Sequence, residues 1–551
     1  MMRKYLLICF SLMLFSCNQE SQKANTPNIL MIIADDLGYT DLGCYGGEIN
    51  TPTIDSLAAT GMMFTNFHTG AMCAPSRSTL FTGQDHHLAG WGRQRDVRGT
   101  FYEGKWGYEN ELSDRVLAFP RLLQANNFAS CFAGKWHLGK ADASMPVNQG
   151  FDQSFVLLQG AANHWNDIGL GLSQFDGTKS LYNRNGQAAD WPSGKYSTTV
   201  YTDEVLQFIN NLEDEQAFFA VASYTAPHWP LQPPEEYKDR YKGRYDDGYN
   251  KLREKRLTAA KAKSIIDEKI NLPPGLDHIK DWDSLSEEEQ KVEARKMELY
   301  AAMLEHLDHD LGRLLDGLRA KGELENTIII FMSDNGADFL DFYNHPIGGF
   351  LRDTYDNSFE NMGDPSSFVS YGPQWAQACM SPFSYYKGYL AEGGVRAPLI
   401  ISGPGVMHGM NRNFLHIQDL APTILDIFET EYPEKFEGNT NPSLIGKSFA
   451  ETLKGEQKEI HAAYEFFFDD FQGMASIIQG DFKLLNTEDP TDNNKFKMYN
   501  IKNDPGEKIN IRSNYRQQTR SMLEAWEGYK KDYRIVYPKN TKDLNPYKEK
   551  K

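Results

Sequence analysis

The chain has 551 residues, of which 40% are hydrophobic and 13% aromatic, and its formal net charge is −18. This length and composition fit a large globular protein with more than one folding unit and exclude a disordered chain. The acidic balance argues against nucleic-acid binding, which needs clustered basic side chains at phosphates. An anionic small molecule could still bind in a locally positive pocket, because charges farther apart than about 8–10 Å are largely screened at ordinary salt.

Residues 1–16 are predicted to form a signal peptide, because a basic start precedes an apolar run that is too short to span a bilayer. The run ends in Leu-Phe-Ser-Cys, which resembles a bacterial lipobox, and the resemblance implies lipidation of Cys17. An ordinary cleaved signal is the alternative. We therefore expect an exported protein of the periplasm or cell surface, attached to a membrane only through Cys17, with residues 17–26 as a polar tether.

Two strands buried on both faces are predicted at residues 28–34 and 327–332. Both are continuous apolar runs rich in β-branched residues, a pattern typical of parallel strands covered by helices on both sides. Further strands are expected at 217–223 and 398–402, with helical stretches between them. The sequence therefore predicts an α/β fold whose large, mostly parallel central sheet is flanked by helices.

Each of the two central strands ends in oxygen-bearing side chains: Asp35 and Asp36 follow the first, and Asp334 and Asn335 follow the second. Ligands bind beyond the carboxyl ends of the strands in open α/β sheets, so the two pairs can converge on one site. Because the set has neither histidine nor thiolate, it favours a hard cation, calcium or magnesium, over zinc. A helix cap or a turn is the simpler explanation for an isolated Asp-Asp pair.

The clearest helix is expected to begin after Ser286, which can form a capping box with Glu289, and to end at Gly322. A charged insert over residues 233–283 lacks strong apolar periodicity and is expected to be peripheral. Apart from Cys9, Cys17 and Cys73, the chain has three cysteines. Their spacing fits neither a zinc pattern nor a full set of pairs, so no disulfide framework is expected.

A change of pattern near residue 455 divides the chain into a catalytic domain, residues 27–454, and a C-terminal subdomain, residues 455–551. Short strand-like segments separated by turn residues predict a small antiparallel sheet in the subdomain. These segments lie at 475–479, 482–485 and 497–501, and a closing helix is expected at 517–529.

Cys73 begins the run Cys-Ala-Pro-Ser-Arg-Ser-Thr-Leu-Phe-Thr-Gly. A tyrosine-phosphatase loop places its arginine six positions after the cysteine, whereas Arg77 follows Cys73 by four, so that class is excluded. A buried structural thiol is the simple alternative. The run resembles the C-x-P-S-R-S-x-L-x-T-G element of the type I sulfatases, a family of the alkaline phosphatase superfamily, and the chain is most similar to its arylsulfatase-like branch. The resemblance implies that a maturation enzyme oxidises Cys73 to formylglycine, an aldehyde that hydrates to a geminal diol.

Three further segments resemble elements of the same family: Gly-Lys-Trp-His-Leu-Gly from Gly134, Thr-Ala-Pro-His-Trp-Pro from Thr225, and Tyr-Lys-Gly from Tyr386. The resemblance implies an alkaline-phosphatase-like fold and a bound calcium ion, with magnesium less favoured. The metal ligands that it implies are Asp35, Asp36, Asp334, Asn335 and the modified Cys73. The catalytic residues that it implies are Cys73, Arg77, Lys135, His137, His228, Lys387 and Asp334. His164 is a possible substrate contact.

The resemblance implies hydrolysis of a sulfate ester to sulfate and an alcohol. One hydroxyl of the diol attacks sulfur and gives its proton to Asp334, while Lys135 and Lys387 offset charge on the sulfuryl oxygens. His228 protonates the departing alcohol, and His137 helps the second hydroxyl to expel sulfate.

The expected partners are a sulfated small molecule or saccharide as substrate and the maturation enzyme. Two alternatives remain open. One is a phosphonate monoester or phosphodiester hydrolase on the same fold, and the other is an inactive surface-binding lipoprotein.

Overall fold

The structure is a computed structural model that describes residues 26–94, 101–172, 177–213, 216–341, 343, 348–456 and 459–539, with the backbone alone at 170–172, 177 and 178. The predicted signal peptide, Cys17 and the tether up to residue 25 lie outside these ranges. Within them, no helix combines the length and apolarity needed to cross a membrane. The cysteines in these ranges carry free thiols; they are Cys44, Cys73, Cys131 and Cys379.

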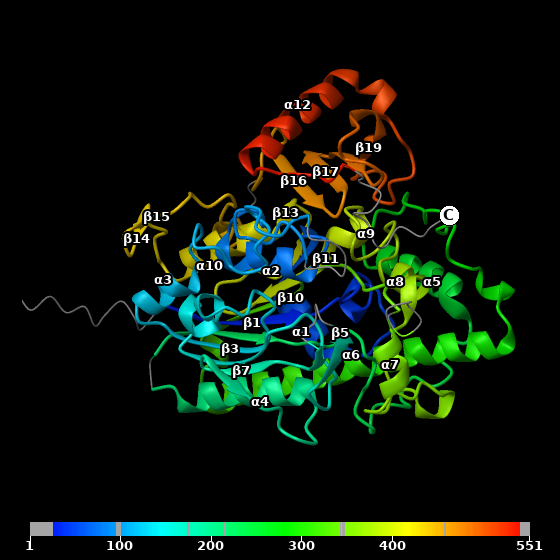
Figure 1. Cartoon of the computed structure of the whole chain (residues 1–551), viewed down its shortest axis with the longest axis horizontal. Coiled ribbons are helices and arrows are strands. Elements are labelled where there is room, and N and C mark those ends of the chain that lie inside the picture. Colours follow the sequence, from blue (N-terminus) through cyan, green and yellow to red (C-terminus); the bar gives the residue numbers. More distant parts are fainter. Residues whose placement is uncertain are drawn as a thin grey trace, which may run out of the picture.

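A large central sheet forms the middle of the molecule (Figure 1). Its strands lie in the order β12 (Gly409–Asn411), β2 (Met62–His68), β11 (Arg396–Ser402), β10 (Thr327–Ser333), β1 (Asn28–Ala34), β9 (Phe218–Ser223), β3 (Ala129–Lys135), β4 (Gln153–Leu157), β7 (Tyr182–Arg184) and β8 (Gln187–Ala189). The run from β10 to β4 is parallel, whereas β11 is antiparallel to both of its neighbours. The predicted mostly parallel sheet is confirmed.

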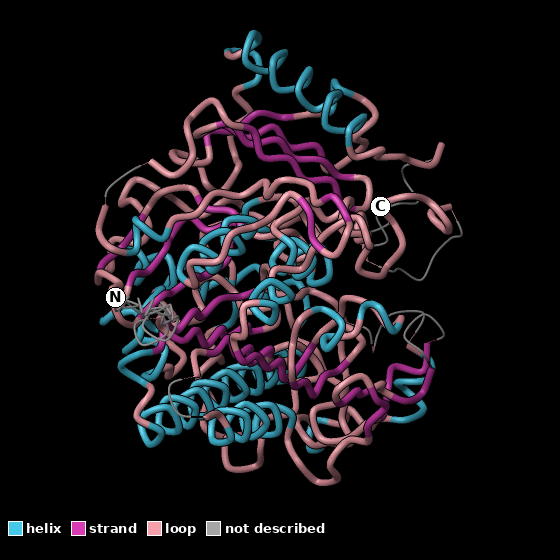
Figure 2. The backbone as a smooth tube through the Cα atoms, turned by 90° about the vertical axis from the view of Figure 1, so that its left-hand side faces the viewer, coloured by secondary structure: helices cyan, strands magenta, loops and turns pink. Residues whose placement is uncertain are grey.

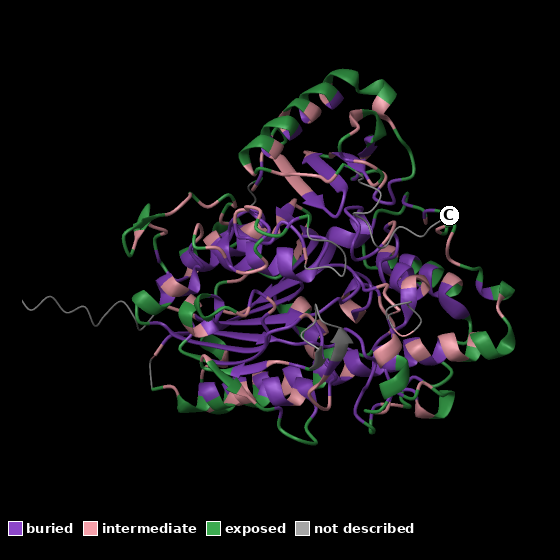
Figure 3. Ribbon diagram, in the orientation of Figure 1, coloured by how far each residue is buried: buried purple, intermediate pink, exposed green. Residues whose placement is uncertain are grey.

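Helices cover both faces of this sheet, which explains the continuous apolar runs of its central strands (Figures 1 and 3). Leu30 and Ile32 of β1 belong to one core cluster, and the intervening Ile29, Met31 and Ile33 belong to another. The first cluster includes residues of α1 (Pro52–Thr60), α4 (Ser197–Asn211) and α6 (Glu287–Lys321). The second includes residues of α2 (Cys73–Thr82), α3 (Pro120–Ala125) and α10 (Leu420–Ile427).

The ends of α6 are those that the sequence predicts. The Ser286 side chain accepts from the backbone N–H of Glu289, whose carboxylate accepts from the backbone N–H of Ser286 in return. Gly322 ends the helix in the left-handed conformation with φ of 81°, which glycine adopts without steric cost.

The charged insert is not peripheral, and this expectation was wrong. It contains α5 (Gly248–Ala262), whose Arg256 is buried. The Arg256 guanidinium donates to Asp41 and, through two nitrogens at 2.9 Å, to the Glu48 carboxylate. Apolar periodicity does not report such a helix, because its buried face includes a charged side chain that is paired with distant carboxylates.

The C-terminal residues form an antiparallel sheet covered by one helix (Figure 2). The strands are β16 (Phe466–Phe471), β17 (Met474–Gln479), β18 (Phe482–Asn486) and β19 (Lys497–Asn500), and the helix is α12 (Arg516–Asp532). Met522 and Trp526 of α12 pack against Ile477 and Leu484 of the sheet. The predicted sheet and closing helix are confirmed, and β16 is an additional strand.

Short elements complete the described fold. They are β5 (Ile168–Leu172), β6 (Gly177–Lys179), β13 (Leu415–His416), β14 (Lys435–Phe436), β15 (Asn439–Thr440), α7 (Gly349–Thr354), α8 (Gly372–Cys379), α9 (Glu392–Val395) and α11 (Ala450–Leu453).

A buried histidine links the C-terminal sheet to the loop that follows α2. His87 Nδ1 lies 3.1 Å from Asp85 Oδ1, and its Nε2 lies 3.5 Å from Asp470 Oδ2 on β16. The Tyr529 hydroxyl of α12 donates to Asp85 over 2.7 Å. Burial alone would lower the pKa of His87, but the two carboxylates raise it from 6.5 to about 9.

We expect His87→Asn to flatten the decrease in Tm of the protein above neutral pH. A raised pKa gives stability that is complete below 6.5 and is lost as the pH rises through about 9. The shift corresponds to on the order of 3 kcal/mol. Calorimetry between about pH 6 and pH 10 measures the difference. The control is His408→Asn, which changes an exposed histidine, and equal pH slopes for both variants would contradict the assignment.

Candidate active site

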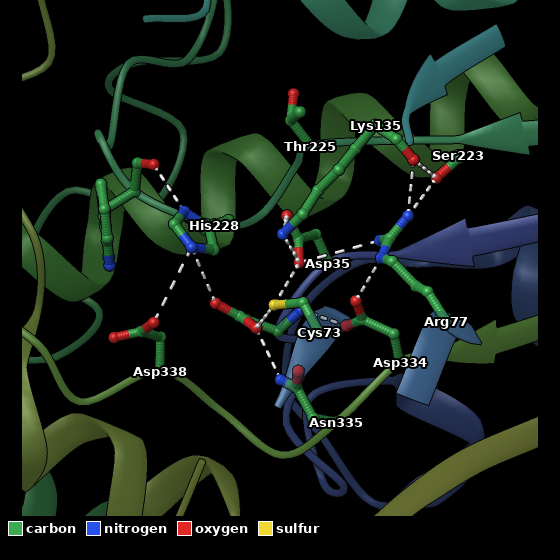
Figure 4. Close-up of polar contacts among 12 residues, drawn as sticks. Asp35, Cys73, Arg77, Lys135, Ser223, Thr225, His228, Asp334, Asn335 and Asp338 are labelled. Carbon is green, nitrogen blue, oxygen red and sulfur yellow. Dashed lines mark hydrogen bonds and ion pairs between the residues drawn. The ribbon is translucent and has the colours of Figure 1, made fainter. Parts of the chain in front are cut away.

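The first feature of the site is the meeting of two strand ends. β1 and β10 are parallel neighbours with Ala34 opposite Ser333, so the residues that follow them leave the sheet at one point. The backbone N–H of Asp36 donates to Asp334 Oδ1 over 3.3 Å, and Asn335 Nδ2 donates to Asp36 Oδ1 over 2.6 Å. The acidic and amide side chains therefore converge as the sequence predicts (Figure 4).

Helix α2 adds the cysteine and the arginine of the motif. Cys73 Sγ lies 3.5 Å from Asp35 Oδ1 and 3.6 Å from Asp36 Oδ1. Arg77 follows one helical turn later, so it lies on the same face of α2. Its Nε donates to Asp334 Oδ2 over 2.8 Å (Figure 4).

Two lysines bring positive charge to the same carboxylates. Lys135 is the last residue of β3, and its Nζ donates to Asp35 Oδ2 over 2.6 Å. Lys387 Nζ donates to Asp36 Oδ2 and to Asp338 Oδ2, each over 2.7 Å. Both lysines are buried.

His228 and His137 occupy different positions around this group. His228 Nε2 lies 3.2 Å from Asp36 Oδ2, and its Nδ1 lies 2.7 Å from the Trp229 carbonyl oxygen. Because a carbonyl can only accept, Nδ1 carries a hydrogen and Nε2 faces the carboxylate. The Nδ1 atom of His137 is buried without a hydrogen-bond partner among the described residues, and burial together with the charges of Lys135 and Arg77 holds the pKa of His137 well below its usual range.

His164 lies behind His228. Its Nδ1 is 2.7 Å from Ser197 Oγ, and its Nε2 is 3.0 Å from the backbone oxygen of His228. Both ring nitrogens thus contact protein groups and support the His228 segment. A substrate contact by His164 stays a prediction.

Sequence reasoning missed two residues of the site. Asp338 is bonded to Lys387 and lies 3.8 Å from His228 Nε2. Ser223, the last residue of β9, accepts from Arg77 Nη1 over 2.6 Å. Their positions in the sequence could have identified them, because Ser223 ends a central strand and Asp338 follows one, both at the carboxyl edge of the sheet.

The buried charges nearly balance. Four buried carboxylates face three buried cations. Lys135 is paired with Asp35, Arg77 with Asp334, and Lys387 with both Asp36 and Asp338. Burial raises the pKa of Asp35 to about 7 despite Lys135. Burial also raises the pKa of Asp36, but Lys387 and His228 outweigh it and hold that pKa well below its usual range.

The oxygen atoms at this point fit a hard divalent cation. The ligand atoms of Asp35, Asp36, Cys73 and Asp334 all lie within 4.8 Å of one another and are buried. Among the residues that the structure describes, Asn335 Oδ1 is buried without a hydrogen-bond partner, which is uncommon for an amide oxygen. A divalent cation would satisfy that oxygen and offset the repulsion between the carboxylates.

Comparison with known proteins identifies the family. Residues 27–430 match the Sulfatase family model, and residues 383–528 match the model for the C-terminal region of N-sulphoglucosamine sulphohydrolase. The chain is 37% identical over 545 residues to an uncharacterized sulfatase of Schizosaccharomyces pombe, covering 95% of this chain and 96% of that protein. It is 36% identical over 418 residues to an arylsulfatase of Klebsiella aerogenes, covering 75% of this chain and 89% of that enzyme.

The crystal structure of Ps i-CgsB in complex with k-i-k-neocarrahexaose has a TM-score of 0.66 to this structure, with 22% sequence identity. The alignment covers 94% of this chain and 96% of that one, so the two proteins share a fold. The Sulfatase model spans most of the chain and includes the Cys73 motif together with the converging strand ends. The chain therefore belongs to the sulfatase family and is a sulfuric ester hydrolase.

Proposed function

We propose that this sulfatase hydrolyses sulfate esters of aryl alcohols or saccharides with a formylglycine derived from Cys73. Formylglycine supplies a geminal diol, one hydroxyl of which attacks sulfur while the other allows sulfate to leave. The observation that carries the proposal is the position of Cys73 Sγ, 3.5 Å from Asp35 Oδ1 and beside the residues paired with Lys135 and Lys387. A sulfuryl group bound at the position of the Cys73 side chain would therefore lie close to Lys135 and Lys387.

Each charged group of the site then has a task in the reaction. Lys135 and Lys387 offset negative charge on the sulfuryl oxygens, and Arg77 holds Asp334 as the acceptor of the attacking hydroxyl's proton. His228 would protonate the departing alcohol from Nε2, since its Nδ1–H donates to the Trp229 carbonyl. Both ring nitrogens must then carry a hydrogen, so His228 acts as the imidazolium; burial lowers the pKa of His228, whereas the neighbouring Asp36 carboxylate favours the charged form. His137 assists loss of the proton from the second hydroxyl.

Buried aromatic side chains pack beside His228. The Trp229 ring centroid lies 4.2 Å from that of His228, and the Phe368 ring centroid lies 5.6 Å from that of Trp229. The arylsulfatase relative supports the first substrate class. Export and lipidation at Cys17 remain proposals that rest on the sequence alone.

Cys73→Ala is expected to lower sulfate release from an aryl sulfate at least about 10⁴-fold, because the nucleophile is lost. Cys44→Ala, which changes a half-buried cysteine elsewhere, should retain activity. Mass spectrometry of the Cys73 peptide should show formylglycine, which is lighter than cysteine. Turnover by Cys73→Ala at the level of the Cys44 control would exclude the proposed nucleophile.

The double variant Lys387→Met/Asp338→Asn is expected to lower kcat/KM about 10²–10³-fold, because one cation at the sulfuryl oxygens is lost. The second substitution removes one of the two buried carboxylates that lose Lys387, and Asp36 keeps its contact with His228, so the protein should still fold. Asp353→Asn, an exposed residue of α7, is the control for the aspartate change. If kcat, measured at saturating substrate, and kcat/KM, measured at limiting substrate, were both unchanged, Lys387 would have no part in the mechanism.

We propose calcium as the cation of the site, held by Asp35, Asp36, Asp334 and Asn335 with the residue derived from Cys73. Elemental analysis of purified protein should find about one calcium per chain. A chelator is expected to lower both Tm and activity, and calcium should restore both better than magnesium. Asp36→Asn should abolish the calcium-dependent rise in Tm. Stoichiometric zinc with no response to calcium would contradict this assignment.

A further inference from the structure

Segment 384–396 carries Lys387 and is bonded on one side to the loops of the active site. The backbone N–H of Lys387 donates to the Ala337 carbonyl over 3.1 Å, and that of Gly388 donates to the Ala71 carbonyl over 2.8 Å. Ala337 follows the Asp334 loop, and Ala71 precedes Cys73. The position of Lys387 is therefore tied to the two loops that hold the reacting groups.

The segment is also folded tightly on itself. A Cβ atom at Gly393 would lie 2.1 Å from the Tyr385 carbonyl oxygen, and one at Gly394 would lie 1.8 Å from the Tyr389 carbonyl oxygen. Real Cβ atoms do not approach backbone this closely, so only glycine fits at these two positions. A shift at one end of the segment would consequently be transmitted to Lys387.

On its other side, the segment is bonded to the C-terminal sheet and the loop after it. The backbone N–H of Glu392 donates to Glu507 Oε2 over 2.9 Å. The Glu392 carboxylate accepts from Lys483 Nζ of β18 over 2.9 Å, and Lys483 Nζ lies 3.0 Å from Glu507 Oε1. Two further residues contact the Glu392 carboxylate: His68 of β2, whose Nε2 is 3.1 Å away, and Arg396 of the segment itself, whose Nε is 3.4 Å away.

These charges are removed from water. Lys483 and Glu392 have exposed fractions of 0%, and Glu507 has 9%. Loss of one partner from a buried ion pair leaves an uncompensated charge, and the surrounding chain must then move or admit water. The family model for the C-terminal region begins at residue 383, so it includes the Lys387 segment together with β18.

We infer that residues 466–507, which include the C-terminal sheet and the loop that contains Glu507 and are called the C-terminal sheet region below, help to build the active site. Lys483 and Glu507 are positioning residues that hold segment 384–396 and thereby Lys387. Both residues act through Glu392. The inference rests on the proposed role of Lys387 at the sulfuryl group and deepens it, because it assigns the support of that lysine to β18 and the loop that contains Glu507.

Lys483→Met tests the inference, with Lys502→Met as the matched control. Lys502 belongs to the same region, is exposed, and lies 3.4 Å from Asp481. Both proteins are compared at equal formylglycine content and at a temperature where both are folded. We expect Lys483→Met to show kcat/KM at least about tenfold below the control, and a similar rise in the inhibition constant of inorganic sulfate. A decrease in Tm with both constants within about twofold of the control would overturn the inference, since that is the result of a purely structural role.

The variant Lys483→Met/Glu392→Gln covers the case in which Lys483→Met does not fold, because it removes the buried carboxylate that loses its partner. If both residues act through one contact, the double variant should lose less sulfate affinity than the sum of the two single variants in free energy. If Lys483→Met is unfolded, the double variant is compared with Lys502→Met instead. We then expect the double variant to bind sulfate at least about tenfold more weakly. Additive losses, or wild-type sulfate affinity in the double variant, would contradict the inference.

The variant Lys387→Met/Asp338→Asn separates this inference from the proposed function. Unchanged sulfate affinity in that protein would mean that Lys387 does not bind the sulfuryl group, and the proposed function would fail at that residue. Loss of affinity there, without loss in Lys483→Met, would overturn only the role of the C-terminal sheet region.

Discussion

Three buried ion pairs at the carboxyl edge of the central sheet determine where the groups of the site lie. Asp35 is paired with Lys135, Asp36 with Lys387, and Asp334 with Arg77. These charges are buried, so a charge that lost its partner would be left uncompensated away from water. Each pair therefore holds its two chain segments together. The segments are β1, β3, β10, α2 and the 384–396 segment, and they are brought together over separations of up to 351 residues.

The same pairing suits an anionic substrate. The carboxylates are oxygen ligands for a hard divalent cation, and a cation there would leave the lysines and the arginine to interact with a sulfuryl group. The two cores on either side of the sheet make this edge a rigid platform. A site that must hold many charges within a few ångströms of one another requires such support, because small displacements change the energies of all the pairs.

The C-terminal sheet is also attached to the rest of the chain through buried charges. Its contacts with the larger part of the chain include two groups of buried charge, one around His87 and one around Glu392. Charged contacts of this kind fix direction and register more closely than apolar packing does, since each donor needs its acceptor at a defined position. The region is thus joined to the site by geometry as well as by burial.

Local patterns in the sequence determined the buried strands, the capping box of α6, the C-terminal strands at 474–479 and 482–486, and the four-residue spacing that puts Cys73 and Arg77 on one face of a helix. Each of these depends on residues within a few turns or one strand. The tertiary structure alone decided the burial of Arg256, the contact of Asp338 with Lys387, and the pairing of Lys483 with Glu392. A buried charge is stable only beside its partner, and these partners lie 215, 49 and 91 residues away, beyond the reach of any local pattern.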